Sequence, residues 1–317
     1  MTDNDTWTIQ RLLNWVTEYL KNKGIDSPRL SAELLLSFVL GLKRIELYTQ
    51  FNKVVEQESL SKLRALVKRA SEHEPIAYLT GTREFYSLDF EITRDCLIPR
   101  PETELLVEHA VEFLRSRDGR QPAVSLPAPS VIEGSNPYVC DLCTGCACVA
   151  VALARNFANC KIVATDISDA ALEVAARNIS RHGLGGRIEL LRGDLFEPII
   201  PGLGPAKFDL IVCNPPYVSE PEFEKLARNV RDFEPKAALA AGADGLDIIK
   251  RVIAGTTQFL KPASALMLEI GNNQGPAVRK LLDATGHFDT ITIEKDYNKL
   301  DRLAIAVMKQ NELQPRP

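Results

Sequence analysis

Residues 138–166 read YVCDLCTGCACVAVALARNFANCKIVATD and predict a strand, a helix and a second strand. Apolar and β-branched residues dominate YVCDL (138–142) and KIVATD (161–166), and the intervening CVAVALA (148–154) is typical of a buried helix. Strands that alternate with helices build a parallel sheet. This stretch therefore predicts an α/β fold.

The same alternation continues almost to the end of the chain. Further strands are predicted at RIELL (187–191), FDLIVCN (208–214), SALMLEIG (264–271), DTITIEK (289–295) and RLAIAVM (302–308). The last two are separated by only DYNKLD (296–301), which is too short for a crossover helix, so we expect them to pair antiparallel. The prediction is a Rossmann-like sheet with helices on both faces.

The region before the sheet is predicted to be a small helical domain, residues 1–75. Apolar residues recur at helical spacing in its first segment, at Ile9, Leu12, Leu13, Val16 and Leu20. A second helix is expected to begin at Ser27-Pro28 and to end at Gly41, with helical segments near 44–50 and 59–72. This domain contains no acid–base cluster, and we expect it to present a surface to a partner.

A linker is predicted at 76–100, before the main domain at 101–317. Within it, TREFYSLDFEI (82–92) alternates aromatic and β-branched residues with polar ones, as a short hairpin does. A helix is expected in PETELLVEHAVEFLRS (101–116). The following DGRQPAVSLPAPSVIEGSNP (118–137) is rich in proline, serine and glycine and predicts a mobile loop.

Composition restricts the possible partners and location. The 317 residues are 45% hydrophobic and 25% charged, with a net charge of -4 and a pI near 5.7. No segment has the apolar length of a membrane span and MTDNDTWT is unlike a signal peptide, so we expect a cytoplasmic protein. An acidic chain has no general attraction for nucleic acid. The basic run Lys62, Arg64, Lys68 and Arg69 is interpreted as a solvated helix face.

Four of the seven cysteines, Cys140, Cys143, Cys146 and Cys148, lie within CDLCTGCAC. A Cys-x-x-Cys-x-x-Cys run can ligate zinc or an iron–sulfur cluster. Here the run passes from a predicted strand into a predicted helix, so the thiols should point in divergent directions. We expect free, buried thiols and no metal.

Small residues follow the first strand of the sheet, as a ligand-binding turn at a helix N-terminus requires. They are Thr144, Gly145, Cys146 and Ala147. The next strand ends at Asp166, at the separation expected of an acid that accepts hydrogen bonds from ribose hydroxyls. Asp166 could instead cap the following helix, although Ser168 and Asp169 also offer caps. The pattern predicts an adenosine-containing cofactor.

The fourth predicted strand continues into Asn214, Pro215, Pro216 and Tyr217. Two prolines hold the backbone extended and lack amide donors, which leaves carbonyl groups free to accept. The Asn214 side-chain carbonyl and the Pro215 carbonyl can each accept one N–H of a planar amide or amine, while the Tyr217 ring packs on its face. This motif predicts a site for a substrate NH2 group.

Asn-Pro-Pro-Tyr after the fourth strand resembles the methyltransferases that act on glutamine or adenine nitrogens. EPIAYLTGTREFYSLDF, LIPRPETELLVE, FEPKAALAAGADGLDIIKRVI and LMLEIGNNQG narrow the resemblance to the release-factor glutamine methyltransferases of the PrmC or HemK family. It covers nearly the whole chain, apart from about 117–137. It implies a seven-stranded domain dependent on S-adenosylmethionine (SAM), a helical domain that helps bind the release factor, and a Gly-Gly-Gln substrate loop.

The resemblance also implies roles for individual residues. It places the SAM loop at Cys143, Thr144, Gly145, Cys146 and Ala147, the ribose acid at Asp166, the adenine contacts at Asp194 and Leu195, and the substrate clamp at Asn214 to Tyr217. It places Arg100 to Thr103 beside the cofactor.

The chain departs from the family pattern in two places. Family members usually read Asp-Leu-Gly-Thr-Gly-Ser-Gly in the SAM loop, whereas this chain keeps only Gly145 of the three glycines. A Cβ at Cys143 and Ala147 disfavours positive φ and close approach to a ligand. Leu195 stands where some members have an aromatic residue.

Two other functions are compatible with the same motifs. An adenine-N6 nucleic-acid methyltransferase could clamp its NH2 group at Asn214 while a flipped base stacks on Tyr217. The acidic composition and the PRPETE segment disfavour it. A non-catalytic binding protein could keep the fold without binding SAM, and titration with SAM would distinguish it.

Overall fold

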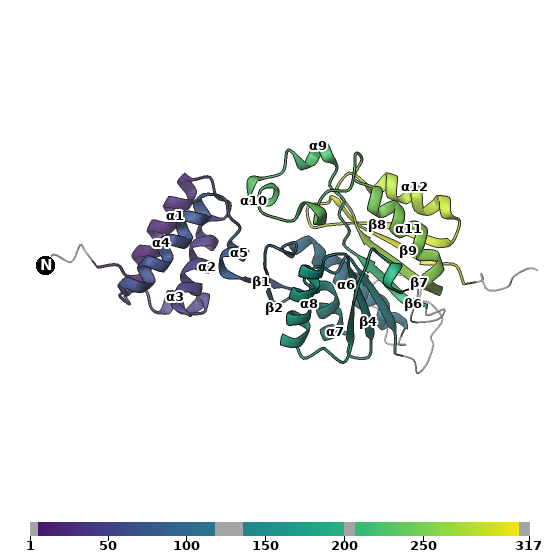
Figure 1. Cartoon of the computed structure of the whole chain (residues 1–317), viewed down its shortest axis with the longest axis horizontal. Helices are drawn as coiled ribbons and strands as arrows, with labels where there is room; N and C mark the ends of the chain where they lie inside the picture. Colours follow the sequence, from purple (N-terminus) through teal and green to yellow (C-terminus); the bar gives the residue numbers. More distant parts are fainter. Residues whose placement is uncertain (1–5, 118–135, 200–206, 311–317) are drawn as a thin grey trace, which may run out of the picture. The chain divides into compact units, whose positions relative to one another are not determined.

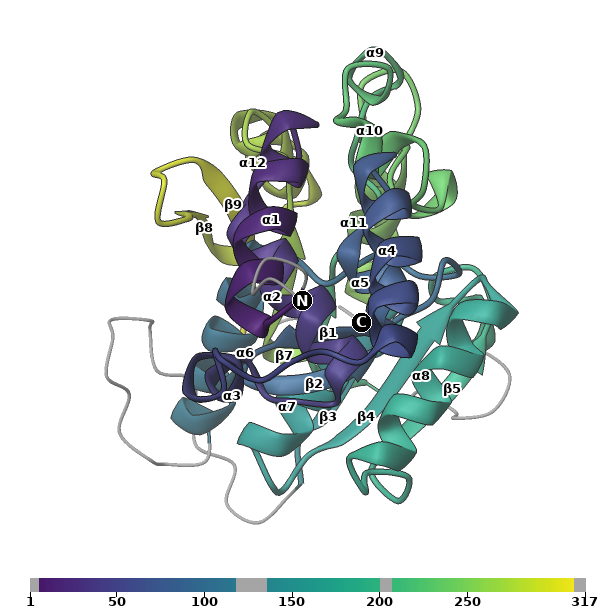
Figure 2. The same cartoon turned by 90° about the vertical axis from the view of Figure 1, so that its left-hand side faces the viewer.

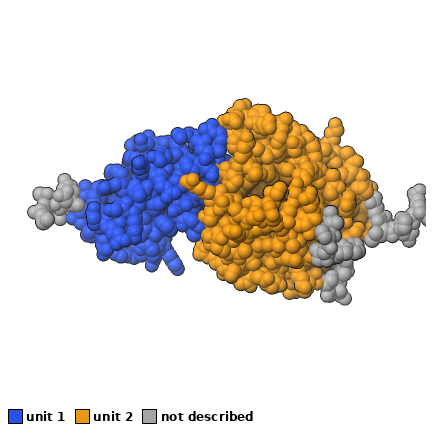
Figure 3. All heavy atoms as spheres, viewed as in Figure 1, with its two compact units in different colours: residues 1–82, 227–233 blue, residues 83–226, 234–317 orange. Residues whose placement is uncertain are grey.

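The computed structural model describes residues 6–117, 136–199 and 207–310. The chain forms two compact units, which Figure 3 distinguishes by colour. The first comprises residues 1–82 and 227–233, and the second comprises 83–226 and 234–317. The loop predicted at 118–137 falls largely on residues 118–135, outside the described part of the chain. No described helix combines the length and the apolar character needed to cross a membrane.

Helices make up the first unit (Figure 1). They are α1 (Ile9–Asn22), α2 (Pro28–Leu40), α3 (Arg44–Thr49), α4 (Gln57–Ser71), α5 (Ile76–Thr80) and α10 (Arg228–Arg231). The predicted apolar stripe of α1 is buried in a core shared with α2 and α4. Figure 2 labels the ribbons of these three helices. Gly41 ends α2 with a φ of 63°, as predicted. Ser27 occupies the N-cap position, but its side chain makes no capping hydrogen bond.

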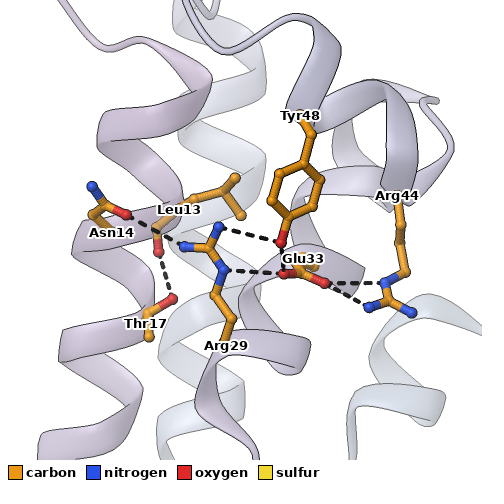
Figure 4. Close-up of polar contacts among 7 residues, drawn as sticks. All are labelled: Leu13, Asn14, Thr17, Arg29, Glu33, Arg44 and Tyr48. Carbon is orange, nitrogen blue, oxygen red and sulfur yellow. Dashed lines mark hydrogen bonds and ion pairs between the residues drawn. The ribbon is translucent and has the colours of Figure 1, made fainter.

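A buried glutamate joins three helices of this unit (Figure 4). Glu33 of α2 is 3% exposed. Its carboxylate accepts hydrogen bonds from Arg29 at 3.0 Å, from Arg44 of α3 at 2.7 Å and from the Tyr48 hydroxyl. Arg29 also donates to Asn14 of α1 at 3.3 Å. Burial alone would raise the pKa of Glu33, but these hydrogen bonds hold that pKa below its ordinary value.

The predicted hairpin follows the helix α5 along the chain. It consists of β1 (Thr82–Phe85) and β2 (Leu88–Glu91), and it turns at Tyr86 and Ser87, which have φ angles of 51° and 58°. A hairpin turn with positive φ at both central residues matches the twist of its strands. The Asn178 side chain holds β2 in place. Its oxygen accepts from the Glu91 amide at 2.7 Å, and its nitrogen donates to the Glu91 carbonyl at 3.0 Å.

The second unit contains a seven-stranded sheet in the order β5-β4-β3-β6-β7-β9-β8. The strands are β3 (Tyr138–Leu142), β4 (Lys161–Asp166), β5 (Ile188–Arg192), β6 (Phe208–Cys213), β7 (Leu260–Glu269), β8 (Phe288–Lys295) and β9 (Asp301–Met308). The first five are parallel to one another, and β9 is antiparallel to both β7 and β8. The predicted fold and the antiparallel final pair are therefore confirmed.

Helices cover both faces of this sheet. One face packs against α6 (Glu104–Arg117), α7 (Cys148–Asn156) and α8 (Asp169–Arg181), and the other against α11 (Asp247–Phe259) and α12 (Gly275–Thr285). The short elements are η2 (Pro101–Thr103), η3 (Glu197–Ile199), α9 (Glu220–Phe223) and η4 (Lys236–Ala238).

The order of strands reverses at β3, because the chain runs outward from β3 to β4 and β5 and then returns to β6 on the other side. In open α/β sheets the loops at such a point separate and leave room for a ligand beyond the carboxyl ends of the strands.

Candidate active site

A cavity of about 430 Å³ lies where the strand order reverses. Its walls include residues that follow β3, β4, β5 and β6. The sequence-predicted residues in those walls are Cys143, Thr144, Gly145, Cys146, Asp166, Asp194, Leu195, Asn214 and Pro216. Ala147, Pro215 and Tyr217 do not line the cavity, although each adjoins a residue that does. The structure thus brings most of the predicted residues to one site.

The β3–α7 loop adopts a shape that normally requires glycine. Cys143, Gly145 and Ala147 have φ angles of 57°, 55° and 63°, all in the left-handed region. A non-glycine residue pays roughly 1–2 kcal/mol for this conformation. The Cβ atoms at 143 and 147 therefore do not exclude positive φ, and the loop holds it at the cost of strain.

Hydrogen bonds hold that loop in place. The Thr144 amide donates to the Thr165 carbonyl at 3.0 Å, and its hydroxyl donates to Asp141 at 2.6 Å. Asp141 is 1% exposed, and burial raises its pKa to about 7 against the effect of the Thr144 hydrogen bond. The loop is thereby fixed to β3 and β4 by buried polar contacts.

Asp166 ends β4 at the wall of the cavity. Its two carboxylate oxygens accept from the backbone amides of Gly145 at 2.8 Å and of Ser168 at 3.0 Å. The cap of α8 is Ser168, whose hydroxyl oxygen accepts from the Ala171 amide at 3.2 Å. Asp166 is therefore not needed as a helix cap. A carboxylate has about four acceptor positions, so two remain for a ligand.

Asp194 and Leu195 form another part of the wall. Asp194 pairs with Arg251 of α11 at 2.7 Å, and Arg251 also lines the cavity. Leu195 has a φ of 53°, and its carbonyl accepts from the Thr165 hydroxyl at 3.1 Å. These contacts place an ion pair and an apolar side chain next to each other in the cavity wall.

Asn214 follows β6 and belongs to a chain of side-chain hydrogen bonds. Its Nδ2 donates to Thr103 Oγ1 at 3.3 Å, and the Thr103 hydroxyl donates to Glu269 Oε2 at 2.6 Å. The Tyr217 hydroxyl donates to Glu269 Oε1 at 3.1 Å. Glu269 is 1% exposed, and burial raises its pKa although both hydrogen bonds oppose that rise. Burial and the neighbouring Glu269 raise the pKa of Tyr217.

Sequence reasoning did not identify Glu269 as part of this site. The available signal was an acid at the carboxyl end of a predicted strand, in SALMLEIG, on the same sheet edge as Asn214.

The segment around LIPRP is fixed by another buried acid. Glu234, which is 6% exposed, accepts from the Ile98 amide at 3.1 Å and from Arg100 at 2.5 Å. Of the predicted stretch from Arg100 to Thr103, the cavity wall includes Thr103, while the Arg100 side chain is paired with Glu234.

Six of the seven cysteines lie in the cavity wall or in the sheet, and the seventh, Cys160, is buried just before β4. Cys96, Cys143, Cys146 and Cys148 line the cavity, whereas Cys140 and Cys213 are buried within β3 and β6. Burial raises the pKa of both strand thiols. Among residues 6–117, 136–199 and 207–310, no group of histidine, cysteine, aspartate or glutamate side chains has the arrangement of a metal site.

The cavity wall combines polar and apolar side chains. Asp166 offers free acceptor positions for hydroxyl groups, whereas Leu97, Leu195 and Ile248 provide apolar wall. Its volume lies within the range of about 300–1,000 Å³ that is usual for small-molecule sites. The residues present therefore fit the adenosine part of SAM.

Two family models match the chain. The PrmC N-terminal domain matches residues 11–81, and a methyltransferase domain matches residues 139–233. Among solved structures, the catalytic domain of hMettl16 in complex with the MAT2A 3'UTR hairpin 1 aligns with a TM-score of 0.54 at 15% identity. That alignment covers 84% of this chain and 86% of the other, and it shows a shared fold.

Full-length relatives are more informative. The release factor glutamine methyltransferase of Rhodopirellula baltica is 39% identical over 304 residues, which cover 95% of this chain and 97% of the relative. The protein of the same name from Geobacter sulfurreducens is 39% identical over 299 residues, covering 94% and 96%. Because identity at this level extends over both units, the chain belongs to the release factor glutamine methyltransferase family.

Proposed function

We propose that this protein transfers a methyl group from SAM to the side-chain amide nitrogen of a glutamine in peptide-chain release factors, within their Gly-Gly-Gln motif. The observation that carries the proposal is the placement of Asn214 and Asp166 in the walls of one cavity. A donor with a ribose and an acceptor with an NH2 group can then occupy adjoining parts of it. The names of the relatives supply the substrate class.

The donor side of the site is assigned to the residues after β3, β4 and β5. SAM supplies a methyl group on a sulfonium, which is an activated electrophile. Asp166 would accept hydrogen bonds from the ribose hydroxyls. The backbone of the Cys143–Ala147 loop would hold the methionine part, and Asp194 and Leu195 the adenine.

The acceptor side is assigned to the residues after β6. Asn214 Oδ1 and the Pro215 carbonyl would each accept one N–H of the glutamine amide, and the Tyr217 ring would pack on its plane. The two hydrogen bonds and the packing contact together fix the plane and direction of the amide.

Positioning is the main contribution that these residues can make. An amide nitrogen is a poor nucleophile, because its lone pair is delocalised into the carbonyl group. Well-oriented intramolecular reactions gain as much as about 7–11 kcal/mol from alignment. Acceptance of both N–H groups also draws electron density onto nitrogen. The methyl carbon of SAM would bond to nitrogen as its bond to sulfur breaks, and the extra proton on nitrogen would then leave to water.

The test is methyl transfer from labelled SAM to separate candidate acceptors. The acceptors are a purified release factor, the same factor with its Gly-Gly-Gln glutamine changed to alanine, and DNA. We expect label on the unaltered factor only, with mass mapping locating it on that glutamine. Label on DNA without label on the factor would overturn the proposal in favour of an adenine methyltransferase.

Because release factors act in translation, which terminates in the cytoplasm, we also propose that the protein is located there.

A further inference from the structure

We infer that Thr103 and Glu269 are positioning residues that hold the Asn214 amide with its oxygen turned to the substrate. This inference rests on the proposed function and extends it to two residues outside the Asn-Pro-Pro-Tyr motif. It follows from which atoms of the hydrogen-bonded chain can donate and which can only accept.

The direction of each hydrogen bond is determined by Glu269. Both hydroxyl groups beside it donate to the carboxylate, Thr103 at 2.6 Å and Tyr217 at 3.1 Å. Burial raises the pKa of Glu269, but these two hydrogen bonds and the nearby charge of Arg302 favour its ionised form, which only accepts. Thr103 has a single hydroxyl hydrogen. Once that hydrogen is directed to Glu269, Thr103 can only accept from Asn214.

The orientation of the Asn214 amide follows. Its NH2 end donates to Thr103 Oγ1 at 3.3 Å, so Oδ1 is at the opposite end of the amide. The reversed orientation would place the Asn214 NH2 group against the substrate NH2 group. Two donors would then face each other, and the substrate would lose an acceptor. Glu269 thus acts on the substrate through Thr103 and Asn214.

Three separate elements bring these groups together. Thr103 ends η2, Glu269 ends β7, and Asn214 follows β6. Because β6 and β7 are adjacent and parallel, with Cys213 opposite Leu268, their carboxyl ends lie side by side. The same Glu269 carboxylate binds Tyr217, so one acid orients the residues on both sides of the two prolines.

The burial of Glu269 supports a role beyond packing. Removing a carboxylate from water costs several kcal/mol, which hydrogen bonds and nearby charge only partly offset. Glu269 is 1% exposed, and both of its oxygens bond to residues of the candidate site. Arg302 is a nearby positive charge, but it makes its ion pair with Asp296 at 3.1 Å.

The first experiment compares Thr103→Val with Thr103→Ser in the full-length protein. Valine keeps the shape and removes the hydroxyl, whereas serine retains it. We expect Thr103→Val to lower kcat for release-factor methylation by about 10- to 100-fold while the Kd for SAM stays within about twofold. Thr103→Ser should restore most of that loss. Glu269→Gln leaves one acceptor oxygen for the two hydroxyl groups of Thr103 and Tyr217, so it should lower kcat by no more than Thr103→Val does.

Two buried residues away from the cavity provide matched controls. Thr256 of α11 is fully buried and donates to the Val252 carbonyl at 2.7 Å. Asp209 is a 5% exposed acid near the other end of β6, bonded to Lys261 at 2.7 Å. Thr256→Val and Asp209→Asn remove the same groups without touching the site. Each folded control should keep kcat within about twofold of the parent.

A second measurement does not depend on the substrate. Hydrogen exchange of the Asn214 side-chain NH2, assigned by its loss in Asn214→Ala, should be slow in the parent and faster in Thr103→Val. Unchanged exchange and unchanged kcat in Thr103→Val would overturn the inference, as would a loss confined to SAM binding. A parent protein that methylates no release factor, yet shows slow exchange that Thr103→Val abolishes, would defeat the proposed function and leave the positioning role standing.

Discussion

Asn214 contributes through a single amide group at the carboxyl end of β6. It does not line the core of the sheet, and its side-chain nitrogen already bonds to Thr103. The remaining oxygen is therefore the group available to a substrate. Removal of this group should affect the reaction more than the fold.

We predict that Asn214→Ala lowers kcat by about 100-fold, corresponding to ~3 kcal/mol for one positioned polar contact, while the Kd for SAM changes little. Asn273→Ala is the control, because Asn273 is an exposed asparagine that bonds to Glu222 at 3.4 Å. Steady-state methylation and calorimetric titration check the two quantities. Near-normal turnover in Asn214→Ala would reject the clamp.

Asp166 is predicted to contribute to donor binding. Asp166→Ala should weaken SAM binding by ~1.5–3 kcal/mol, because charge-assisted hydrogen bonds to the ribose are lost. Asp169→Ala removes a nearby acid that is exposed and paired with Arg192 at 2.9 Å. Titration calorimetry should show a shift for the first variant and none for the second. Equal dissociation constants for Asp166→Ala and the parent would leave only a structural role for Asp166.

Asp141 makes stability depend on pH in the direction opposite to most acids. Its pKa is raised from 3.8 to about 7 by burial. Between these values the folded protein binds the extra proton, so stability falls as pH rises. We predict that the parent loses about 2–4 kcal/mol relative to Asp141→Asn between pH 4 and pH 8. Urea unfolding across that range measures the difference, and parallel stability curves would contradict the prediction.

At the scale of elements, the β3–α7 loop combines a required shape with unfavourable residues. Ala147 is the N-cap of α7 and has a φ of 63°. Glycine adopts this conformation without the Cβ penalty, although it loses more entropy on folding. The loop is nevertheless held by the contacts of Thr144 and Gly145 to β3 and β4.

We predict that Ala147→Gly raises the free energy of unfolding by up to about 1 kcal/mol. The matched control is Ala176→Gly, at an exposed position inside α8, which should lower it by about 0.5–1 kcal/mol. Denaturant unfolding of both variants gives the comparison. Destabilisation of equal size in both would show that Ala147 is not strained.

At the scale of the whole molecule, the helical unit exposes large apolar side chains. Phe38 and Ile45 are 52% and 69% exposed. The unit matches the PrmC N-terminal domain, and the candidate site belongs to the other unit. We propose that this unit binds release-factor surface remote from the glutamine, because such binding offsets the entropy of ordering a flexible glycine loop.

We predict that the double substitution Phe38→Ser and Ile45→Ser lowers kcat/KM for a whole release factor by about tenfold and leaves it unchanged for a short Gly-Gly-Gln peptide. Tyr297→Ser, at an aromatic residue that is 91% exposed in the second unit, is the control and should change neither value. Unfolding measurements confirm that the variants fold. Equal effects on factor and peptide would remove this surface from substrate recognition.

Much of the architecture was predictable from local patterns. Alternating apolar segments located the strands, DYNKLD required an antiparallel final pair, and Gly41 marked the end of α2. The site edge was also predictable, since Asp166 ends one strand, Asn214 follows another, and the carboxyl ends of parallel strands meet at one edge. These features depend on short-range periodicity and on rules that hold for every sheet of this class.

The tertiary structure alone decided which side chains meet. Thr103 lies 111 positions from Asn214 and 166 from Glu269, and no local pattern reveals that three elements converge there. It also decided that Cys143 and Ala147 take positive φ and that residues 227–233 join the helical unit. The sequence of each segment determines which conformation that segment prefers by itself. Which side chains contact one another, and which residues take a strained φ, depends on packing between distant segments. The combined energy of that packing outweighs a local conformational preference of about 1–2 kcal/mol.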